Sequence, residues 1–277
     1  MNSITNMDAL QMIPITSQLL EKIRNTAPLV HNITNYVVMN SSANILLALG
    51  ASPVMAHSRK EVEEMAGMAG CLVLNIGTLE AAWNAAMLLA AKSANNSGLP
   101  VVLDPVGAGA TAYRSRTVHR LLAETNVSVI RGNASEVLSL AAADVKTKGV
   151  DSSLSVSEEI VDTAGSIARQ HGCVVAISAE RDLLTDGDRV FRVGNGVPMM
   201  TRVTGLGCGL SAVVGAFCAV AEGDLLAATA AAFGFYGLCG EMAYESSQLP
   251  GGFFVAFVDA LYAADSADIR ARLQIDP

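Results

Sequence analysis

Short apolar runs alternate along this chain with longer, Ala-rich stretches. Six of the runs, each four to six residues long, are rich in Val, Ile and Leu and end in small or polar residues. Unbroken apolar runs of this length are typical of strands that are buried on both faces of a parallel sheet. We therefore predict inner strands at Pro28–His31, Ser52–Met55, Cys71–Ile76, Pro100–Asp104, Val127–Arg131 and Cys173–Ser178.

The stretches between these runs have helical length and helical stop signals. Asn40–Leu49 is closed by Gly50, and Thr78–Asn96 is closed near Gly98; glycine commonly ends helices because it adopts the left-handed conformation without strain. This alternation predicts a three-layer α/β/α fold with a central, mostly parallel sheet. No linker, low-complexity tract or fixed-period repeat divides the sequence, so we expect residues 1–277 to form a single domain.

The C-terminal part departs from this alternation. Asp186-Gly187-Asp188 predicts a tight turn between two short strands at Asp182–Thr185 and Arg189–Val193. Three apolar helices are expected to follow, at Cys208–Ala221, Leu225–Ser246 and Gly252–Ala264.

Two uncharged segments raise the alternative of a membrane hairpin. Val203–Ala221 contains 19 residues without a charge and Leu225–Gly240 another 16, which approaches the length of a spanning helix. The link between them, Glu222-Gly223-Asp224, is acidic and has no basic flanks, so we expect buried core helices and no membrane partner. The first twenty residues contain Asp8 but neither Lys nor Arg, unlike a secretory signal peptide. A cytoplasmic protein is expected.

Composition narrows the classes of partner. Apolar residues make up 51% of the chain and charged residues only 16%, which requires extensive burial inside the fold or between subunits, and we expect a homo-oligomer. The net charge of −8 and the lack of a Lys/Arg cluster argue against nucleic acid as a partner. The five cysteines form neither a C-x-x-C pair nor a zinc-ligand spacing, as expected in a reducing cytoplasm.

A glycine-rich segment, Val203-Thr204-Gly205-Leu206-Gly207-Cys208-Gly209, precedes a predicted helix. Backbone N–H groups that converge at a helix N-terminus bind anions, and a transferring phosphoryl group is such an anion. The alternative is a turn that packs two core helices. Cys208 also has two interpretations: a thiol whose pKa the helix N-terminus lowers, so that it accepts a proton from a substrate hydroxyl, or a small buried apolar residue.

Carboxylates follow two predicted strands. Asp104 ends one of them, where a buried carboxylate needs a partner such as a hydrated Mg²⁺; the alternative is a turn aspartate before proline. Glu136 lies three residues after Asn133, a spacing that also forms a plain capping box. If the two carboxylates share one edge of the sheet, they are suited to Mg²⁺ with ATP phosphates. Arg131 adds a cationic fork that matches phosphate oxygens.

A fourth polar segment, His31-Asn32-Ile33-Thr34-Asn35, follows the first predicted strand. Its side chains are suited to hydrogen-bond a small ligand, and Met55, at the end of the next strand, is suited to form an apolar wall beside it. A structural turn is the alternative.

These motifs together resemble the ribokinase-like superfamily of small-molecule kinases, and most closely the hydroxyethylthiazole kinase family. The resemblance covers about Pro28–Glu136 and Val174–Ala221. The segments that carry it, in the family's order and spacing, are PLVHNITNYVVMNSSANILLALGASPVMA, LVLNIGT, LPVVLDPVGAGAT, VIRGNASE and VTGLGCGLSAVVGAFCAV.

The resemblance implies a kinase of thiamin salvage that phosphorylates the hydroxyl of 4-methyl-5-(2-hydroxyethyl)thiazole with ATP and Mg²⁺. It also implies a trimer whose thiazole sites lie between subunits. Matching motifs assign Asn35, Met55 and Gly205 to the thiazole, Arg131 and Ser178 to ATP, Asp104 and Glu136 to Mg²⁺ and the phosphates, and Gly205, Gly207 and Cys208 to the anion hole.

Three positions affect how closely the sequence resembles the superfamily and the family. Cys208 occupies a position where the wider superfamily usually has Asp, and this family is similar in having Cys there. A thiol with an ordinary pKa near 8.5 is a modest base, so we expect its catalytic contribution to be small beside that of the anion hole. Ser178 replaces a residue that is commonly Thr in the family, and Leu206 replaces a smaller one.

Two alternative functions are considered. A pyridoxal or hydroxymethylpyrimidine kinase of the same superfamily shares the phosphate-binding motifs, so only the ITN and PVM segments favour the thiazole. A catalytically silent nucleotide-binding subunit is a different class of protein. The combination of Asp104, Glu136 and the glycine-rich segment argues against it.

Overall fold

The structure is a computed structural model that describes residues 9–141 and 158–276. One nine-stranded sheet has the order β2-β1-β3-β4-β5-β6-β7-β8-β9. The strands from β2 to β6 pair in parallel, and the three after β6 pair antiparallel. The strands are β1 (Leu29–Ile33), β2 (Ser52–Val54), β3 (Cys71–Asn75), β4 (Val101–Asp104), β5 (Val129–Asn133), β6 (Val174–Ser178), β7 (Asp182–Thr185), β8 (Val190–Val193) and β9 (Ile275–Asp276).

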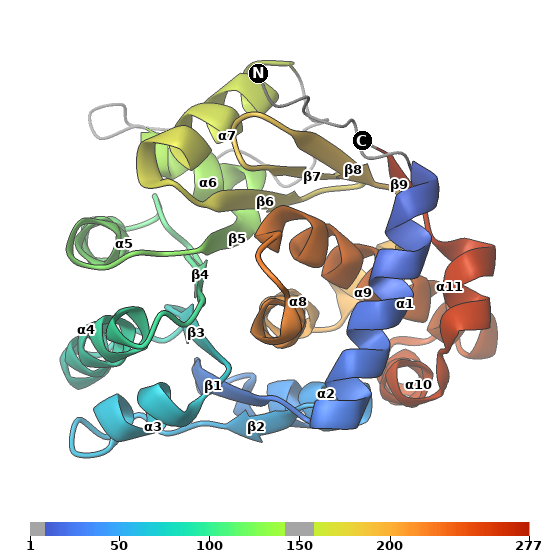
Figure 1. Ribbon diagram of the computed structural model, residues 1–277, viewed down its shortest axis with the longest axis horizontal. Coiled ribbons are helices and arrows are strands. Elements are labelled where there is room, and N and C mark those ends of the chain that lie inside the picture. The colour runs from blue at the N-terminus through green and yellow to red at the C-terminus, as the bar shows by residue number, and fades with distance from the viewer. Residues whose placement is uncertain (1–8, 142–157, 277) are drawn as a thin grey trace.

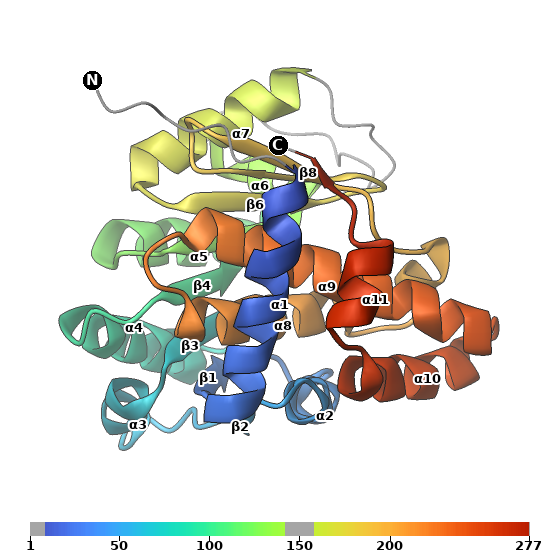
Figure 2. The same ribbon diagram turned by 45° about the vertical axis from the view of Figure 1, so that its right-hand side comes forward.

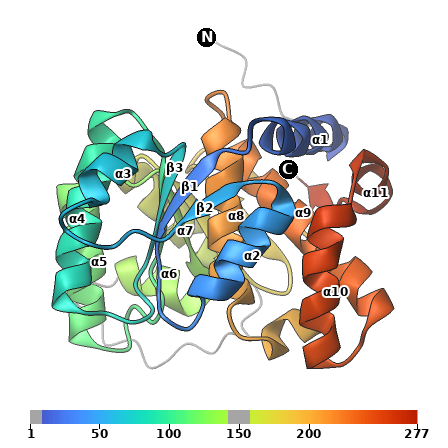
Figure 3. The same cartoon turned by 90° about the horizontal axis from the view of Figure 1, so that it is seen from below.

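Helices cover both faces of this sheet, so the predicted three-layer α/β/α fold is confirmed (Figure 1). One layer contains α3 (Val62–Met68), α4 (Ala81–Asn96), α5 (Ala112–Glu124), α6 (Ala134–Ala141) and α7 (Glu158–His171). The other contains α1 (Ala9–Thr26), α2 (Met39–Leu49), α8 (Leu206–Val220), α9 (Leu225–Ser246), α10 (Pro250–Ala263) and α11 (Ser266–Arg272). Figure 3 shows the two layers on opposite sides of the strands.

All six predicted inner strands are present, but two extend further than predicted. The strand β1 continues to Ile33, so Asn32 and Ile33 lie within it and not in a loop after it. The reason is the neighbouring strand, because β3 pairs with β1 as far as Ile33. In the same way β5 runs to Asn133, opposite Ser178 of β6.

The helix predicted from Thr78 begins three residues later, at Ala81 of α4. The hydroxyl of Thr78 instead accepts a hydrogen bond from the backbone N–H of Tyr36. Gly50 ends α2 with a φ of 105°, as its position in the sequence predicted. Gly187, at the predicted hairpin turn, has a φ of 100°.

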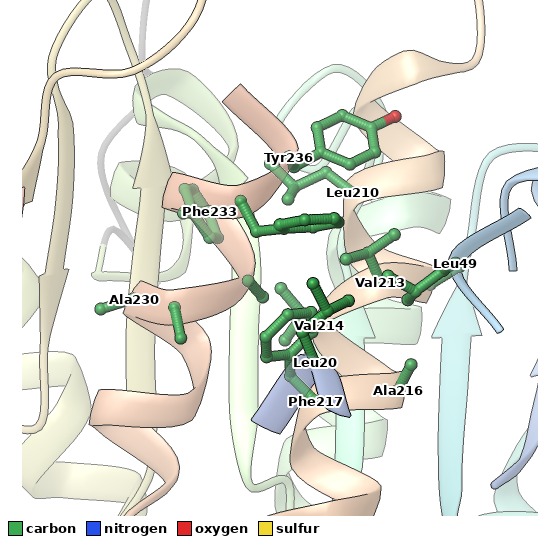
Figure 4. Packing of buried hydrophobic residues seen from close by; sticks show 14 of the residues in the cluster. Leu20, Leu49, Leu210, Val213, Val214, Ala216, Phe217, Ala230, Phe233 and Tyr236 are labelled. Carbon is green, nitrogen blue, oxygen red and sulfur yellow. The ribbon is translucent and has the colours of Figure 1, made fainter. Parts of the chain in front are cut away.

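The apolar helices α8 and α9 form most of the core on one side of the sheet. Figure 4 shows Phe233 and Tyr236 of α9 packed against Leu210 and Val213 of α8. By length and composition α9 could cross a membrane, but 83% of its most apolar 18-residue window is buried inside the structure. This burial agrees with the prediction of core helices.

An N-terminal helix, α1, was not predicted from the sequence. It runs across α8 and α9 (Figure 2) and inserts Met12, Leu20 and Ile23 into the core. Pro14 interrupts its helical pattern in the sequence. Packing against α9 gives this segment the apolar contacts that stabilise it as a helix.

Candidate functional site

The candidate site lies where the carboxyl ends of the parallel strands meet the N-terminus of α8. The strand register places Asn75 beside Asp104 and Asn133 beside Ser178. Ser211 of α8 donates a hydrogen bond of 2.7 Å to Asp104 Oδ2, which fixes the helix against this edge of the sheet. Residues from distant parts of the sequence therefore converge at one place, as expected at the carboxyl edge of an α/β sheet.

The glycine-rich segment forms an open helix N-terminus. Gly205 is the N-cap of α8 with a φ of 89°, and no side chain of the described residues caps this helix. The N–H of Gly209 bonds to the carbonyl of Gly205 at 2.8 Å, so the N–H groups of Leu206, Gly207 and Cys208 precede the intrahelical bonds. Three N–H groups and the helix dipole are thus available to an anion; Gly207 and Cys208 of the predicted anion hole supply two of them, whereas Gly205 is the N-cap.

Asp104 lies in the centre of the site and is 1% exposed. Its Oδ2 accepts hydrogen bonds from Asn75 Nδ2 and Ser211 Oγ, both at 2.7 Å, whereas Oδ1 has no hydrogen bond among the described residues. Burial raises the pKa of Asp104 to about 6; the guanidinium of Arg131 opposes this rise and the carboxylate of Glu136 adds to it. A buried carboxylate with a free oxygen has a strong need for a cationic partner.

Arg131 and Ser178 lie together beside the α8 N-terminus. Arg131 Nη1 donates to the carbonyl of Gly207 at 2.9 Å and Nη2 donates to the hydroxyl of Ser178 at 2.5 Å. The closest oxygen of Asp104 lies 3.9 Å from Nη1. The Nε of Arg131 is buried and has no partner in the part of the chain that the structure describes. Nη1 and Nη2 each use one of their two N–H groups there, so each keeps one N–H for a further acceptor.

Glu136 forms the capping box considered as the alternative for this residue. Its backbone N–H donates to Asn133 Oδ1 and its Oε2 accepts from the Asn133 N–H, both at 2.9 Å. Its Oε1 also accepts from the Gly107 N–H at 2.8 Å. The same carboxylate therefore ties the loop after β4 to the start of α6, and a lone pair remains on each oxygen.

Cys208 lies in the first turn of α8, and of its two interpretations the one with a lowered thiol pKa is contradicted. Burial, followed by the charge of Asp104, raises the pKa of the Cys208 thiol to about 11. A helix N-terminus stabilises a thiolate by no more than about 1–2 kcal/mol, which is too little to offset these two effects. Cys208 is therefore a neutral thiol at neutral pH.

Asn35 is buried at the other side of Cys208. Its Nδ2 donates to Asn75 Oδ1 at 2.8 Å and lies 3.5 Å from Cys208 Sγ. Gly77 approaches it closely, since a Cβ at that position would lie 2.5 Å from Asn35 Nδ2. The structure thus places Asn35 within the cluster that also contains Asp104.

Met55 follows β2 and is half-buried. Its carbonyl lies 3.1 Å from His57 Nδ1, and the next carbonyl, of Ala56, lies 2.7 Å from His31 Nε2. The ring of His57 packs against Trp83 in a tilted arrangement with centroids 4.7 Å apart, and Tyr36 packs against the same indole, also tilted, at 4.7 Å. Trp83 therefore packs between the segment of Asn35 and the segment of Met55.

Three residues that hold the site together had no role in the sequence predictions. They are Asn75, Ser211 and Arg114. Arg114 of α5 donates to the carbonyls of Ile76, Gly77 and Val106, which pins the loops after β3 and β4. Asn75 ends a buried strand as Asp104 does, so the rule that identified Asp104 applies to Asn75 as well.

No cluster of three or more His, Cys, Asp or Glu side chains is positioned for a metal ion within residues 9–141 and 158–276. A Mg²⁺ site does not require one, because Mg²⁺ commonly binds one or two carboxylates and takes its remaining ligands from water and substrate phosphates. The free Oδ1 of Asp104 and the spare lone pairs of Glu136 fit that requirement.

A profile of the hydroxyethylthiazole kinase family matches residues 20–266. The chain belongs to this family. It is 55% identical over 243 residues to the hydroxyethylthiazole kinase of Desulfotalea psychrophila, with 88% of each chain covered. It is 51% identical over 256 residues to that of Oleidesulfovibrio alaskensis, which covers 92% of this chain and 96% of the relative.

Solved structures agree with this assignment. The hydroxyethylthiazole kinase of Pyrococcus horikoshii OT3 matches with a TM-score of 0.87 at 42% identity, covering 95% of this chain and 98% of that chain. A pyridoxal kinase from Staphylococcus aureus matches with a TM-score of 0.63 at 14% identity, covering 91% and 98%. The second likeness concerns the fold alone and confirms the predicted ribokinase-like architecture.

Proposed function

We propose that this protein transfers the γ-phosphoryl group of ATP to the hydroxyl of 4-methyl-5-(2-hydroxyethyl)thiazole, in the biosynthesis or salvage of thiamin. The observation that carries the proposal is the position of the open α8 N-terminus between Asn35 and Asp104. Cys208 in its first turn lies 3.5 Å from Asn35 Nδ2, and Ser211 one turn later bonds Asp104 at 2.7 Å. An anion hole placed between a polar substrate contact and a carboxylate is suited to phosphoryl transfer.

The chain's main contribution to the reaction is positioning and charge stabilisation. The N–H groups of Gly207 and Cys208 face the developing charge on the transferred group, and Gly205 allows the chain to turn into the helix. The raised pKa of Cys208 argues that its thiol lines the site and does not act as the base.

Mg²⁺ would be held by Asp104 and Glu136. Its chemistry there is to neutralise charge on the phosphates and to orient them. Binding a cation would also stabilise the ionised form of Asp104, whose pKa burial raises to about 6.

ATP would contact Arg131 and Ser178. The guanidinium of Arg131 has a fixed direction, since both terminal nitrogens are bonded within the described part of the chain, and each of them keeps one further N–H. Phosphate oxygens are acceptors suited to such a fork. Ser178 retains the hydroxyl expected of the more common Thr.

The thiazole would contact Asn35, Met55 and Gly205, at a site between subunits of a homotrimer. Beside the buried Asn35, Tyr36 is 60% exposed and Val37 65% exposed, and an apolar ring needs a more enclosed surface than this. Two cavities, of about 330 and 240 Å³, lie along α4 and α5 and include none of these residues.

A neutral, apolar face supports self-association. The helix α2 has no charged residue, and α10 has only Asp259. Figure 3 shows α2 and α10 side by side. Leu47, Val255 and Tyr262 are exposed on these two helices. Exposed apolar area of this kind is typical of protein interfaces.

The remaining parts of the proposal concern the whole chain. The single sheet supports one kinase domain. The burial of α9 argues against a membrane partner and the net charge of −8 against nucleic acid; a cytoplasmic location is part of the proposal.

The test is an ATP-consumption assay with Mg²⁺ against hydroxyethylthiazole, pyridoxal, hydroxymethylpyrimidine and simple sugars. Turnover is expected with the thiazole and should require Mg²⁺. Turnover with another alcohol alone would replace the thiazole by that substrate. Activity with none of them would favour a silent nucleotide-binding subunit.

A further inference from the structure

Asn75, the last residue of β3, lies between the two halves of the candidate site and is 2% exposed. Its side chain bonds Asn35 on one side and Asp104 on the other, at 2.8 and 2.7 Å. The proposed function assigns Asn35 to the alcohol substrate and Asp104 to Mg²⁺ and the phosphates. Asn75 joins them without belonging to either group.

The orientation of the Asn75 amide is fixed by its surroundings. Its Oδ1 accepts from the backbone N–H of Gly77 at 2.9 Å and from Asn35 Nδ2, while its Nδ2 donates to Asp104 Oδ2. A flipped amide would place an NH₂ group against the Gly77 N–H and an oxygen against the carboxylate. Both contacts would be repulsive in a buried site.

The Asn35 amide is fixed in the same way. Its Oδ1 accepts from the backbone N–H of Val37 at 3.1 Å, and one N–H of its Nδ2 is used by Asn75. Its remaining N–H donates to Cys208 Sγ at 3.5 Å. Both N–H groups of Asn35 are thus engaged, the second on a sulfur that is a weak acceptor, and one lone pair remains on its Oδ1.

We propose that Asn75 is a positioning residue that locks the orientation of the Asn35 amide beside the alcohol substrate and holds Asp104 in register with it. This inference rests on the proposed function, because it concerns the same site. Asn75 touches neither substrate nor metal. It acts through Asn35 on alcohol binding and through Asp104 on phosphoryl transfer.

The two actions predict separate effects. Asn75→Ala frees the Asn35 amide to rotate, and we expect the Kd of the alcohol to rise about tenfold, which is the typical effect of losing one buried hydrogen bond. It also leaves Asp104 with one hydrogen bond fewer, and we expect kcat to fall about tenfold or more.

A double-mutant cycle tests the first action. Alcohol binding is measured by calorimetry without ATP or Mg²⁺ for wild type, Asn35→Ala, Asn75→Ala and the double variant, with whichever alcohol the wild type turns over. In the Asn35→Ala background, Asn75→Ala should change the Kd less than about twofold. A full tenfold change in that background would overturn the inference, because Asn75 would then act by another route.

Asn75→Asp tests the second action and remains informative if Asn75→Ala does not fold. It keeps an acceptor for Asn35 and Gly77 but places an oxygen against Asp104. The Kd of the alcohol should stay within about twofold of wild type while kcat falls about tenfold or more. Wild-type kcat in Asn75→Asp, or a large rise in its Kd, would refute the assignment.

Asn84→Ala is the matched control. Asn84 donates to Tyr113 Oη and Thr117 Oγ1 in the α4–α5 layer, away from the strand ends. It should alter neither Kd nor kcat; if it does, the effects of Asn75→Ala are not specific to the site. If the wild type turns over no alcohol, the proposed function fails and the inference fails with it. If the wild type turns over the alcohol and Asn75→Ala has the same Kd and kcat, only the inference about Asn75 is overturned and the proposed function stands.

Discussion

Replacing Cys208 by Ala tests whether the thiol takes the substrate's proton. Cys208 occupies the position where a catalytic base is expected in the wider superfamily. Burial and the charge of Asp104 raise the pKa of its thiol to about 11. The question is whether a base with that pKa could accelerate the reaction at neutral pH.

The magnitudes give a clear answer. At pH 7.5 a group with a pKa of about 11 is deprotonated in about one molecule in 3,000, which corresponds to a cost of about 5 kcal/mol. General-base catalysis contributes roughly 10²–10⁴-fold to a rate. The cost of forming the thiolate therefore cancels most of the gain, and Cys208→Ala should keep kcat within about tenfold of wild type.

The assay is steady-state ATP consumption at saturating Mg²⁺ and alcohol between pH 6 and 9. Wild type and Cys208→Ala should show parallel pH profiles. Cys208→Ser serves as the control for packing, because it changes the size of the side chain least. Cys208→Asp should keep or raise kcat, since a carboxylate is ionised at neutral pH more readily than this thiol.

Two results would refute this reasoning. One is a folded Cys208→Ala variant whose kcat is reduced more than about a hundredfold. The other is a wild-type kcat that rises tenfold per pH unit over this range while the kcat of the variant does not. Either would mean that the thiolate is the catalytic form.

Three further perturbations test other parts of the structure. Glu136 accepts hydrogen bonds from two backbone N–H groups, those of Gly107 and Asn133. Glu136→Gln replaces one carboxylate oxygen by an NH₂ group, so one of these N–H groups loses its acceptor. Urea unfolding should show a loss of about 1–3 kcal/mol, and turnover should need more Mg²⁺; an unchanged Mg²⁺ requirement would make Glu136 a cap only. Gly209→Ala places a Cβ 2.5 Å from Ile45 Cδ1. Overpacking should lower the free energy of unfolding by about 1–3 kcal/mol and lower Tm. An unchanged Tm would show that neighbouring side chains move to accept the methyl group. Burial raises the pKa of Asp182 to about 7, so its ionisation destabilises the fold progressively as pH rises from about 4 to 7 and fully above that. Asp182→Asn should then be more stable than wild type by about 2 kcal/mol at pH 8, which is roughly half of the free energy that the full pKa shift corresponds to. Near pH 4 the two proteins should be equally stable. Equal stability at both pH values would contradict the claim that burial raises the pKa of Asp182.

The sequence predicted the layers of the fold because apolar periodicity and glycine stop signals are local properties. It predicted α9 to the residue, Leu225–Ser246. It did not predict α1, whose helical state depends on packing against α9. Strand ends such as Ile33 were misplaced because a strand ends where its neighbour stops pairing, and that neighbour is distant in the sequence.

The candidate site was likewise predicted only in part from the sequence. Asp104, Glu136 and the glycine-rich segment were identified from the sequence because each has a recognisable local context at a strand end or a helix start. What they do depends on contacts across the fold. Glu136 is both a cap and a tie to Gly107, and the pKa of Cys208 is raised where its helix position alone predicted a lowered one.

The sequence by itself determined the α/β class and the kinase family, and it marked the glycine-rich segment as a candidate anion site, since these depend on periodicity and motifs that are continuous in the chain. Only the tertiary structure decided how Asn35, Asn75 and Asp104 form one hydrogen-bonded row and how buried Cys208 is. These are properties of residues brought together from separate strands and from α8. Hydrogen-bond direction and desolvation depend on such neighbours, and a linear sequence does not specify them.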